Sequence, residues 1–379
     1  MREHAGCRSR GVARQGSHTS RPSARRARDW PIYGRYHWVG PACIASARAE
    51  SLPSGGGDTT PIFSRASQQL FRLVTAPLYT RKPVTYSEAW VESYVPSRTY
   101  YLSSESREQL RMRGKRPAIH GRAGTYIQRI YNRLLIDLSY NSARLEGNTY
   151  TLADTERLLF QGVGAEGKPN AERIVILNHK EAIRYLVQNV SSLRPDMDTI
   201  RTLHYLLADS LVAPGFAGQI RAAGIAVGGT TYSPLEGEER LSRLMAGLLD
   251  KARQINDPFE QSLFLLGHLS YLQAFVDVNK RMARLACIIP LITCDYVPQS
   301  FIDVDKNDYL KALIGWYEFN DVSALADLYS WSYLRACEHY DTSMQVIGFD
   351  EIAALYRPQR RAKAWRQPRR RWPTAMNFA

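Results

Sequence analysis

The stretch QAFVDVNKRMAR, Gln273 to Arg284, decides the fold. It follows the segment FEQSLFLLGHLSYL, which Asp257 and Pro258 open as an N-cap and a first helical residue. A segment that is apolar nearly all round predicts a helix buried at the centre of the fold. From Asn279 the pattern is helical again. The stretch therefore predicts a loop that leads into the N-terminus of a second helix.

This loop combines features that suit a phosphate ligand. The first turn of a helix offers unpaired N–H groups and a partial positive charge. Lys280, Arg281 and Arg284 add full charges, which oppose the helix dipole unless an anion lies between them. Asp277 supplies a hard oxygen of the kind that Mg²⁺ prefers. The competing interpretation is an exposed basic helix start that Asp277 caps.

The rest of the chain is predicted to be mainly α-helical. Helical spacing runs from Tyr126 to a stop at Gly147, and Thr151 opens a further helix with a near-capping box. One segment differs, GQIRAAGIAVGGTTYSP, residues 218–234, which predicts a short hairpin around Gly228-Gly229. Further helices are expected over residues 171–190, 197–210, 307–317 and 322–339, and from residues 238 and 258.

Two motifs resemble signatures of the Fic (Fido-domain) family. QAFVDVNKRMAR is similar to the family's H-P-F-x-D/E-G-N-G/K-R-x-x-R, and SARLEGN, residues 142–148, is similar to its inhibitory motif S/T-x-x-x-E-G/N. Gly218 to Arg221 resembles the family's G-x-x-R, and the hairpin that follows resembles its target-docking flap. The residues that match the first motif are Phe275, Asp277, Asn279, Lys280, Arg281 and Arg284, and those of the flap are Ile225, Ala226, Val227 and Gly228.

The resemblance implies a Fic/Fido helical fold with a short β-hairpin flap and an activity like that of the protein adenylyltransferases. These proteins mostly transfer AMP from ATP to a hydroxyl of a target protein, so ATP and Mg²⁺ are the implied cofactors. The resemblance also implies that Glu146 pairs with Arg284 and thereby inhibits the protein. Implied roles are metal binding for Asp277, nucleotide binding for Asn279, Lys280, Arg281 and Arg284, and inhibition for Ser142, Glu146 and Asn148.

Three positions depart from the family pattern. Gln273 stands at the position of the family's histidine, Ala274 replaces proline and Val278 replaces glycine. The histidine is the general base of the family, and an amide cannot accept a proton near neutral pH, so catalysis is expected to be impaired. His268 lies five residues earlier, well off the same helix face, and is expected to be a core histidine.

Two hypotheses about function follow. The first is a divergent adenylyltransferase that Glu146 inhibits, and the second is a non-catalytic module that binds a nucleotide and a protein partner. The retained Asp277, Asn279, Arg281 and Arg284 favour nucleotide binding under both. A regulator that binds DNA through basic tails is a weaker third alternative. The protein target is not predicted, and a homodimer is left open.

Composition bounds these hypotheses. The chain has 379 residues and a net charge of +14. Residues 1–30 hold eight arginines and two acids, and residues 357–379 hold seven arginines, one lysine and no acid, so the two tails carry the whole excess. A nucleic-acid interface beyond these tails is therefore not expected. Five scattered cysteines and the lack of an apolar leader predict a cytoplasmic protein with no membrane partner.

Four regions are expected from these patterns. Residues 1–65 form a basic, disordered segment, and residues 66–190 form an N-terminal helical region that carries the inhibitory motif at 142–148. The Fido domain takes residues 191–342, and residues 343–379 form a basic tail.

Overall fold

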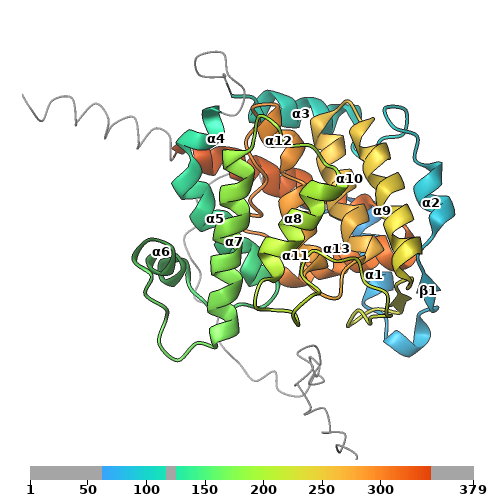
Figure 1. Cartoon of the computed structure of the whole chain (residues 1–379). Helices are drawn as coiled ribbons and strands as arrows, with labels where there is room; N and C mark the ends of the chain where they lie inside the picture. The colour runs from blue at the N-terminus through green and yellow to red at the C-terminus, as the bar shows by residue number, and fades with distance from the viewer. Residues whose placement is uncertain (1–61, 117–124, 343–379) are drawn as a thin grey trace, which may run out of the picture. The chain divides into compact units, whose positions relative to one another are not determined.

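The computed structural model describes residues 62–116 and 125–342, and all of them lie within one compact unit, Gly55–Ala379. The mainly helical fold is as predicted (Figure 1). The predicted segments 1–65 and 343–379 lie outside the described residues, apart from residues 62–65.

The helices are α1 Arg65–Val74, α2 Glu88–Ser93, α3 Ser104–Gly114, α4 Thr125–Arg129, α5 Tyr131–Leu145, α6 Leu152–Gln161, α7 Asn170–Gln188, α8 Met197–Ala208, α9 Glu238–Arg253, α10 Pro258–Leu272, α11 Asn279–Ala286, α12 Ile289–Thr293, α13 Lys306–Phe319 and a last helix over residues 323–342. A 3-10 turn covers Leu78–Thr80.

Helix α10 lies at the centre, as its apolar sequence predicts. Nearly all of its side chains are buried, and it packs against α9, α11, α12 and α13. Asp257 caps it by accepting hydrogen bonds from the backbone N–H groups of Phe259 and Glu260, 3.0 and 3.1 Å long. Gly267 leaves room for the Trp316 ring of α13, because a Cβ there would lie 2.2 Å from that ring. The loop after α10 therefore begins from a rigid support.

Helices α5, α7, α8 and α11 form a connected group beside this core (Figure 1). Helix α5 packs on α7, α7 on α8, and α8 on α11. The predicted helix from Tyr126 is broken at Ile130, which separates α4 from α5. At its far end Glu146 is the C-cap, and Gly147 follows with φ +95°, a conformation that favours glycine. The group thus carries the end of α5 to the start of α11.

The predicted hairpin does not form. Residues 225–231 contain no strand, and β2, Tyr232–Ser233, pairs in parallel with β1, Val84–Thr85. Backbone groups that a hairpin would use have other partners: Val84 N–H donates to the Thr231 carbonyl, and Thr231 N–H donates to Glu318. Pairing with the distant strand β1 therefore replaces the hairpin in this segment. The sequence of the segment alone could not predict that pairing.

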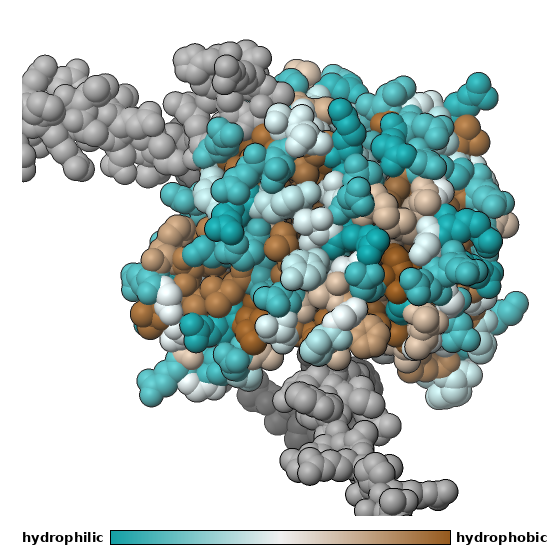
Figure 2. All heavy atoms as spheres, viewed as in Figure 1, coloured by the Kyte–Doolittle hydropathy of each residue, from teal (hydrophilic) through white to brown (hydrophobic). Residues whose placement is uncertain are grey.

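The surface carries an apolar patch on the side where α6 lies (Figure 2). Leu152, Phe160 and Val163, in α6 and just after it, are exposed to between 38% and 50%. Patches of this kind are common on globular proteins, so this one assigns no partner. Within the described ranges no helix is both long and apolar enough to cross a bilayer.

Candidate functional site

The loop between α10 and α11 has left-handed backbone at both ends. Gln273 is the C-cap of α10 with φ +50°, and Val278 is the N-cap of α11 with φ +67°. The left-handed region is unfavourable for a β-branched residue such as valine. A glycine at 278, as in the family pattern, would adopt it freely. The loop therefore keeps the glycine-type conformation although its sequence lacks the glycine.

Asn279 closes the loop from within. Its side-chain carbonyl accepts the Phe275 N–H at 2.9 Å, and its amide donates to the Phe275 carbonyl at 2.8 Å. The side chain is buried, and both of its polar groups are used in this way. The observed contact of Asn279 is thus with the loop backbone, and its predicted contact with a phosphate stays a prediction.

His204 of α8 braces the loop from the side. Its ring stacks on Phe275 with centroids 3.9 Å apart and an interplanar angle of 8°. Its Nδ1 accepts the Gly218 N–H at 2.8 Å, so Nε2 carries the proton and donates to the Asp277 carbonyl at 3.1 Å. Burial lowers the pKa of His204 to about 4, and the ring is therefore neutral at pH 7.

Arg221 ties the loop to the segment that was predicted as a flap. Its Nε donates to the Gln273 carbonyl at 2.7 Å, and its two terminal nitrogens donate to the carbonyls of Ala223 and Leu235 at 2.6 and 2.5 Å. The Gly237 N–H also donates to the Ala222 carbonyl at 3.0 Å. The predicted docking residues Ile225, Ala226, Val227 and Gly228 lie in the loop that these contacts close, and they are exposed or half-buried.

The side-chain amide of Gln273 is hydrogen-bonded within the protein. The Gln273 Nε2 donates to the Ser270 carbonyl at 2.7 Å, and the residue is 5% exposed. The side chain thus satisfies one of the last carbonyls of α10. An amide in this position has no proton-accepting group at neutral pH.

His268 lies in the core, as expected. It is fully buried among the rings of Trp90, Tyr101, Phe264 and Trp316, and its Nε2 is 2.8 Å from the Tyr101 hydroxyl. Burial lowers the pKa of His268 to about 3. It does not replace the missing histidine of the loop.

Asp277 is the residue of the loop that faces solvent most. Its side chain is 60% exposed, one carboxylate oxygen accepts the Val278 N–H at 2.6 Å, and the other lies 3.6 Å from Arg281. The described residues contain no group of three or more potential metal-binding side chains. A Mg²⁺ ion held by one carboxylate together with phosphate oxygens and water fits Asp277, because Mg²⁺ keeps several non-protein ligands.

The cations of α11 face the end of α5. The Glu146 carboxylate lies 2.7 Å from a terminal nitrogen of Arg284 and 2.9 Å from the Lys280 ammonium. Burial alone would raise the pKa of Glu146, but the charges of Lys280, Arg284 and Arg281 outweigh it and hold this pKa well below its usual range. Arg281 and Arg284 are buried, so the alternative of an exposed basic helix start is wrong. The N-cap is Val278 rather than Asp277.

The other two residues of the inhibitory motif have different surroundings. Ser142 contacts Arg284 through both its hydroxyl and its carbonyl, each at 3.0 Å. Asn148 instead shapes the turn after α5, because its amide donates to the Glu172 carbonyl and its side-chain oxygen accepts the Tyr150 N–H. The structure thus brings Ser142 and Glu146 to α11 and leaves Asn148 against α7.

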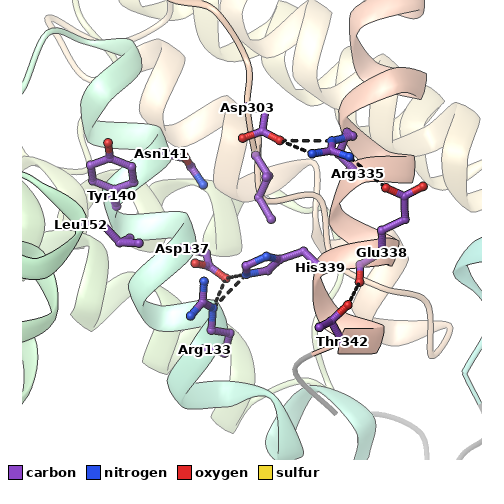
Figure 3. A pocket seen from close by; sticks show the side chains of 11 residues that line it. Arg133, Asp137, Tyr140, Asn141, Leu152, Asp303, Arg335, Glu338, His339 and Thr342 are labelled. Carbon is purple, nitrogen blue, oxygen red and sulfur yellow. Dashed lines mark hydrogen bonds and ion pairs between the residues drawn. The ribbon is translucent and has the colours of Figure 1, made fainter. Parts of the chain in front are cut away.

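A separate cavity of about 830 Å³ lies between α5, residues 302–303 and the last helix (Figure 3). Its charged lining residues pair with one another, as in the contacts of Asp137 with Arg133 and His339 and of Asp303 with Arg335. None of the residues of the α10–α11 loop lines it. It is therefore distinct from the candidate site.

The sequence missed several supporting residues. His179 and His204 could not be placed, because a lone histidine on a helix carries no signal about its partner. The weak G-x-x-R match pointed to Arg221 but not to its contact with Gln273. Tyr309, whose hydroxyl accepts from Arg284 at 3.3 Å, had no signal.

Comparison with known proteins agrees with this geometry. Residues 194–291 match the family model described as Fic/DOC family. The chain is similar to "Protein adenylyltransferase fic-1" of Caenorhabditis elegans, with 27% identity over 198 residues, which are 51% of this chain and 39% of the relative. It is also similar to "Protein adenylyltransferase Fic" of Nematostella vectensis, with 28% identity over 179 residues, 46% of this chain and 41% of the relative. The chain thus spans about two fifths of the length of these relatives.

Solved structures show the same fold. A fragment of Fic-1 from C. elegans superposes with a TM-score of 0.52 at 17% identity and covers 74% of this chain and 73% of that chain. A Fic family protein from Desulfovibrio desulfuricans G20 gives a TM-score of 0.50 at 20% identity, covering 69% of this chain and 77% of that one. The match of residues 194–291 thus identifies a Fic/DOC domain in this chain, and the solved structures share its helical fold.

Proposed function

We propose that the protein binds Mg-ATP at the α10–α11 loop, resembles the protein adenylyltransferases in function, and is inhibited by its own Glu146. The observation that carries the proposal is the contact of the Glu146 carboxylate with Arg284 and Lys280, 2.7 and 2.9 Å long. Lys280 lies in the first turn of α11, where a cation is unfavourable unless an anion accompanies it, and the buried Arg284 in the last turn also needs an anion. Glu146 supplies that anion in this state, and the phosphates of ATP are the anion that the loop would otherwise bind.

The parts of the proposed nucleotide site have distinct tasks. Asp277 would hold Mg²⁺, which neutralises phosphate charge when bound. The loop amides and the first turn of α11 would receive phosphate oxygens, while Lys280, Arg281 and Arg284 would supply charge. Asn279 and His204 keep the loop in shape through their contacts with Phe275 and Asp277. The relatives' names, protein adenylyltransferases, support a nucleotide as the ligand.

Catalysis by the parent chain would be impaired at Gln273. Transfer of AMP to a protein hydroxyl forms a new bond from that oxygen to the α-phosphorus, releases pyrophosphate and requires an acceptor for the hydroxyl proton. Gln273 cannot accept it, and loss of a general base costs about 10²- to 10⁴-fold in rate. The bond of its amide to the Ser270 carbonyl favours a second candidate function, a module that binds a nucleotide and a protein without turnover.

Transfer of label from α-labelled ATP with Mg²⁺, into the protein itself or a cell lysate, separates these functions. The variants are the parent, Glu146→Gly, and Glu146→Gly with Gln273→His. Label in Glu146→Gly alone would identify a working, self-inhibited transferase. Label only after Gln273→His would support the non-catalytic module. Absence of label from all three, together with absence of Mg-ATP binding, would overturn the proposed function.

A further inference from the structure

Besides its ion pair with Glu146, the buried guanidinium of Arg284 donates two hydrogen bonds to one residue of α5. Its Nε donates to the Ser142 hydroxyl and a terminal nitrogen donates to the Ser142 carbonyl, each at 3.0 Å. That carbonyl is one of the last four of α5, which have no partner within the helix. Ser142 therefore holds Arg284 through two groups, and neither of them belongs to Glu146.

In the first of these contacts the Ser142 hydroxyl oxygen must accept a hydrogen bond from Nε of Arg284. A serine in a helix commonly donates its proton to a carbonyl of the preceding turn. Here the hydroxyl lies 2.9 Å from Nε2 of His179 on α7, and both residues are fully buried. The proton of this hydroxyl therefore points to a partner outside α5, and its direction leaves the oxygen lone pairs facing Arg284.

The direction of this contact follows from the other nitrogen of the ring. Nδ1 of His179 lies 2.7 Å from the Val175 carbonyl. A carbonyl can only accept, so Nδ1 carries the proton and Nε2 must accept from Ser142. Burial lowers the pKa of His179 to about 3, helped by the charges of Arg281 and Arg284, so the ring keeps its free lone pair at pH 7.

We propose that His179 is a positioning residue for Arg284. Through Ser142 it fixes the guanidinium in one orientation, whether or not Glu146 is paired with it. The two residues of the inhibitory motif then have separable tasks. Ser142, together with His179, sets the position of the Arg284 guanidinium, and Glu146 forms the ion pair with it. The consequence for nucleotide binding rests on the proposed function, whereas the hydrogen-bond chain does not.

The hydrogen-bond chain is tested on the full parent chain by ¹⁵N NMR of the histidine rings. We expect the Nδ1–H tautomer for His179 and the Nε2–H tautomer for His204, whose Nδ1 accepts from Gly218 and which serves as the internal control. Assignment uses the His179→Gln and His204→Gln variants. An Nε2–H tautomer at His179 would overturn the proposal, whatever the affinity of the variants for Mg-ATP.

The consequence for Arg284 is tested by Mg-ATP titration in the Glu146→Gly background. His179→Leu should weaken binding by about tenfold, because the Ser142 hydroxyl loses its acceptor and no longer holds the Arg284 guanidinium in one orientation. His179→Gln, whose amide oxygen can still accept from Ser142, should stay within about threefold of the background. Ser142→Ala should weaken binding as His179→Leu does, and combining the two should add little, since both act through one chain.

The outcomes separate the two proposals. Equal affinity of His179→Leu and His179→Gln, or full additivity with Ser142→Ala, contradicts positioning by His179. If the Glu146→Gly protein binds no Mg-ATP, the proposed function fails. The His179 tautomer and the additivity of Ser142→Ala and His179→Leu in urea unfolding then decide the positioning role on their own.

Discussion

The Glu146 carboxylate lies 2.7 Å from the guanidinium of Arg284, whose side chain is fully buried, whereas that of Glu146 is 22% exposed. The pair joins the C-cap of α5 to the last turn of α11 across 138 residues of sequence. A buried cation without a partner is costly, so Arg284 needs either this carboxylate or another anion.

The ion pair of Glu146 with Arg284 should contribute to the free energy of unfolding at neutral pH and lose this contribution as pH falls. Because the folded pKa of Glu146 is depressed, its contribution is fully present above the unfolded pKa of about 4.3 and is lost as pH falls through the folded pKa. The difference in unfolding free energy between the parent and Glu146→Gln should therefore be constant from pH 7 to about pH 5 and shrink below about pH 4. Urea unfolding at several pH values measures it, and a decline already between pH 7 and pH 6 would contradict the assignment.

The backbone at Val278 gives a second prediction. Its φ of +67° is unfavourable for any residue with a Cβ, by about 1 kcal/mol or more. Both Val278→Ala and Val278→Gly remove the buried methyl groups, but only glycine is released from this cost. Val278→Gly should therefore be more stable than Val278→Ala by about 1 kcal/mol in chemical denaturation. Equal stability, or a more stable alanine variant, would show that the left-handed backbone is not imposed here.

Asn279 should stabilise the folded protein in the absence of any ligand. Both of its polar groups bond to Phe275, and their loss leaves a buried N–H and carbonyl without partners. We expect Asn279→Ala to lower the free energy of unfolding by about 2 kcal/mol. Asn307→Ala, at an exposed position near the start of α13, is the matched control and should change stability by about 0.5 kcal/mol or less. Similar losses for both variants would rule out the bracing role of Asn279.

Asp277 should affect the metal and not the fold. Its carboxylate is largely exposed, and its ion pair with Arg281 is 3.6 Å long. In the Glu146→Gly background we expect Asp277→Asn to remove most of the gain in ATP affinity that Mg²⁺ provides over EDTA, while thermal stability stays within about 1 °C of the background, as expected for a surface change. An unchanged Mg²⁺ dependence would move the metal site away from Asp277.

The sequence predicted the central elements of this fold well, because their signals are local. The apolar run of α10, its Asp257 N-cap and the capping box at Thr151 each need only neighbouring residues, and all are confirmed. The meeting of Glu146 with Arg284 came from the resemblance of two motifs, since spacing alone cannot join positions so far apart.

What the sequence could not predict depends on distant partners. The predicted hairpin does not form because the Thr231 carbonyl accepts from the Val84 N–H and the Thr231 N–H donates to Glu318. His204 and Arg221 act through backbone atoms of the loop, which no side-chain pattern encodes. The bond of the Gln273 amide to the Ser270 carbonyl is likewise visible only in the folded chain.

Calorimetric titration with Mg-ATP tests inhibition by Glu146 most directly. It compares the parent, Glu146→Gly, Glu146→Gln, which removes the charge but keeps the size, and Glu146→Gly with Arg284→Ala. We predict that both single variants bind at least about tenfold more tightly than the parent, since each frees a buried cation for phosphate, and that the added Arg284→Ala removes the gain. Equal affinity in the parent and both single variants would contradict the claim that Glu146 occupies the nucleotide site.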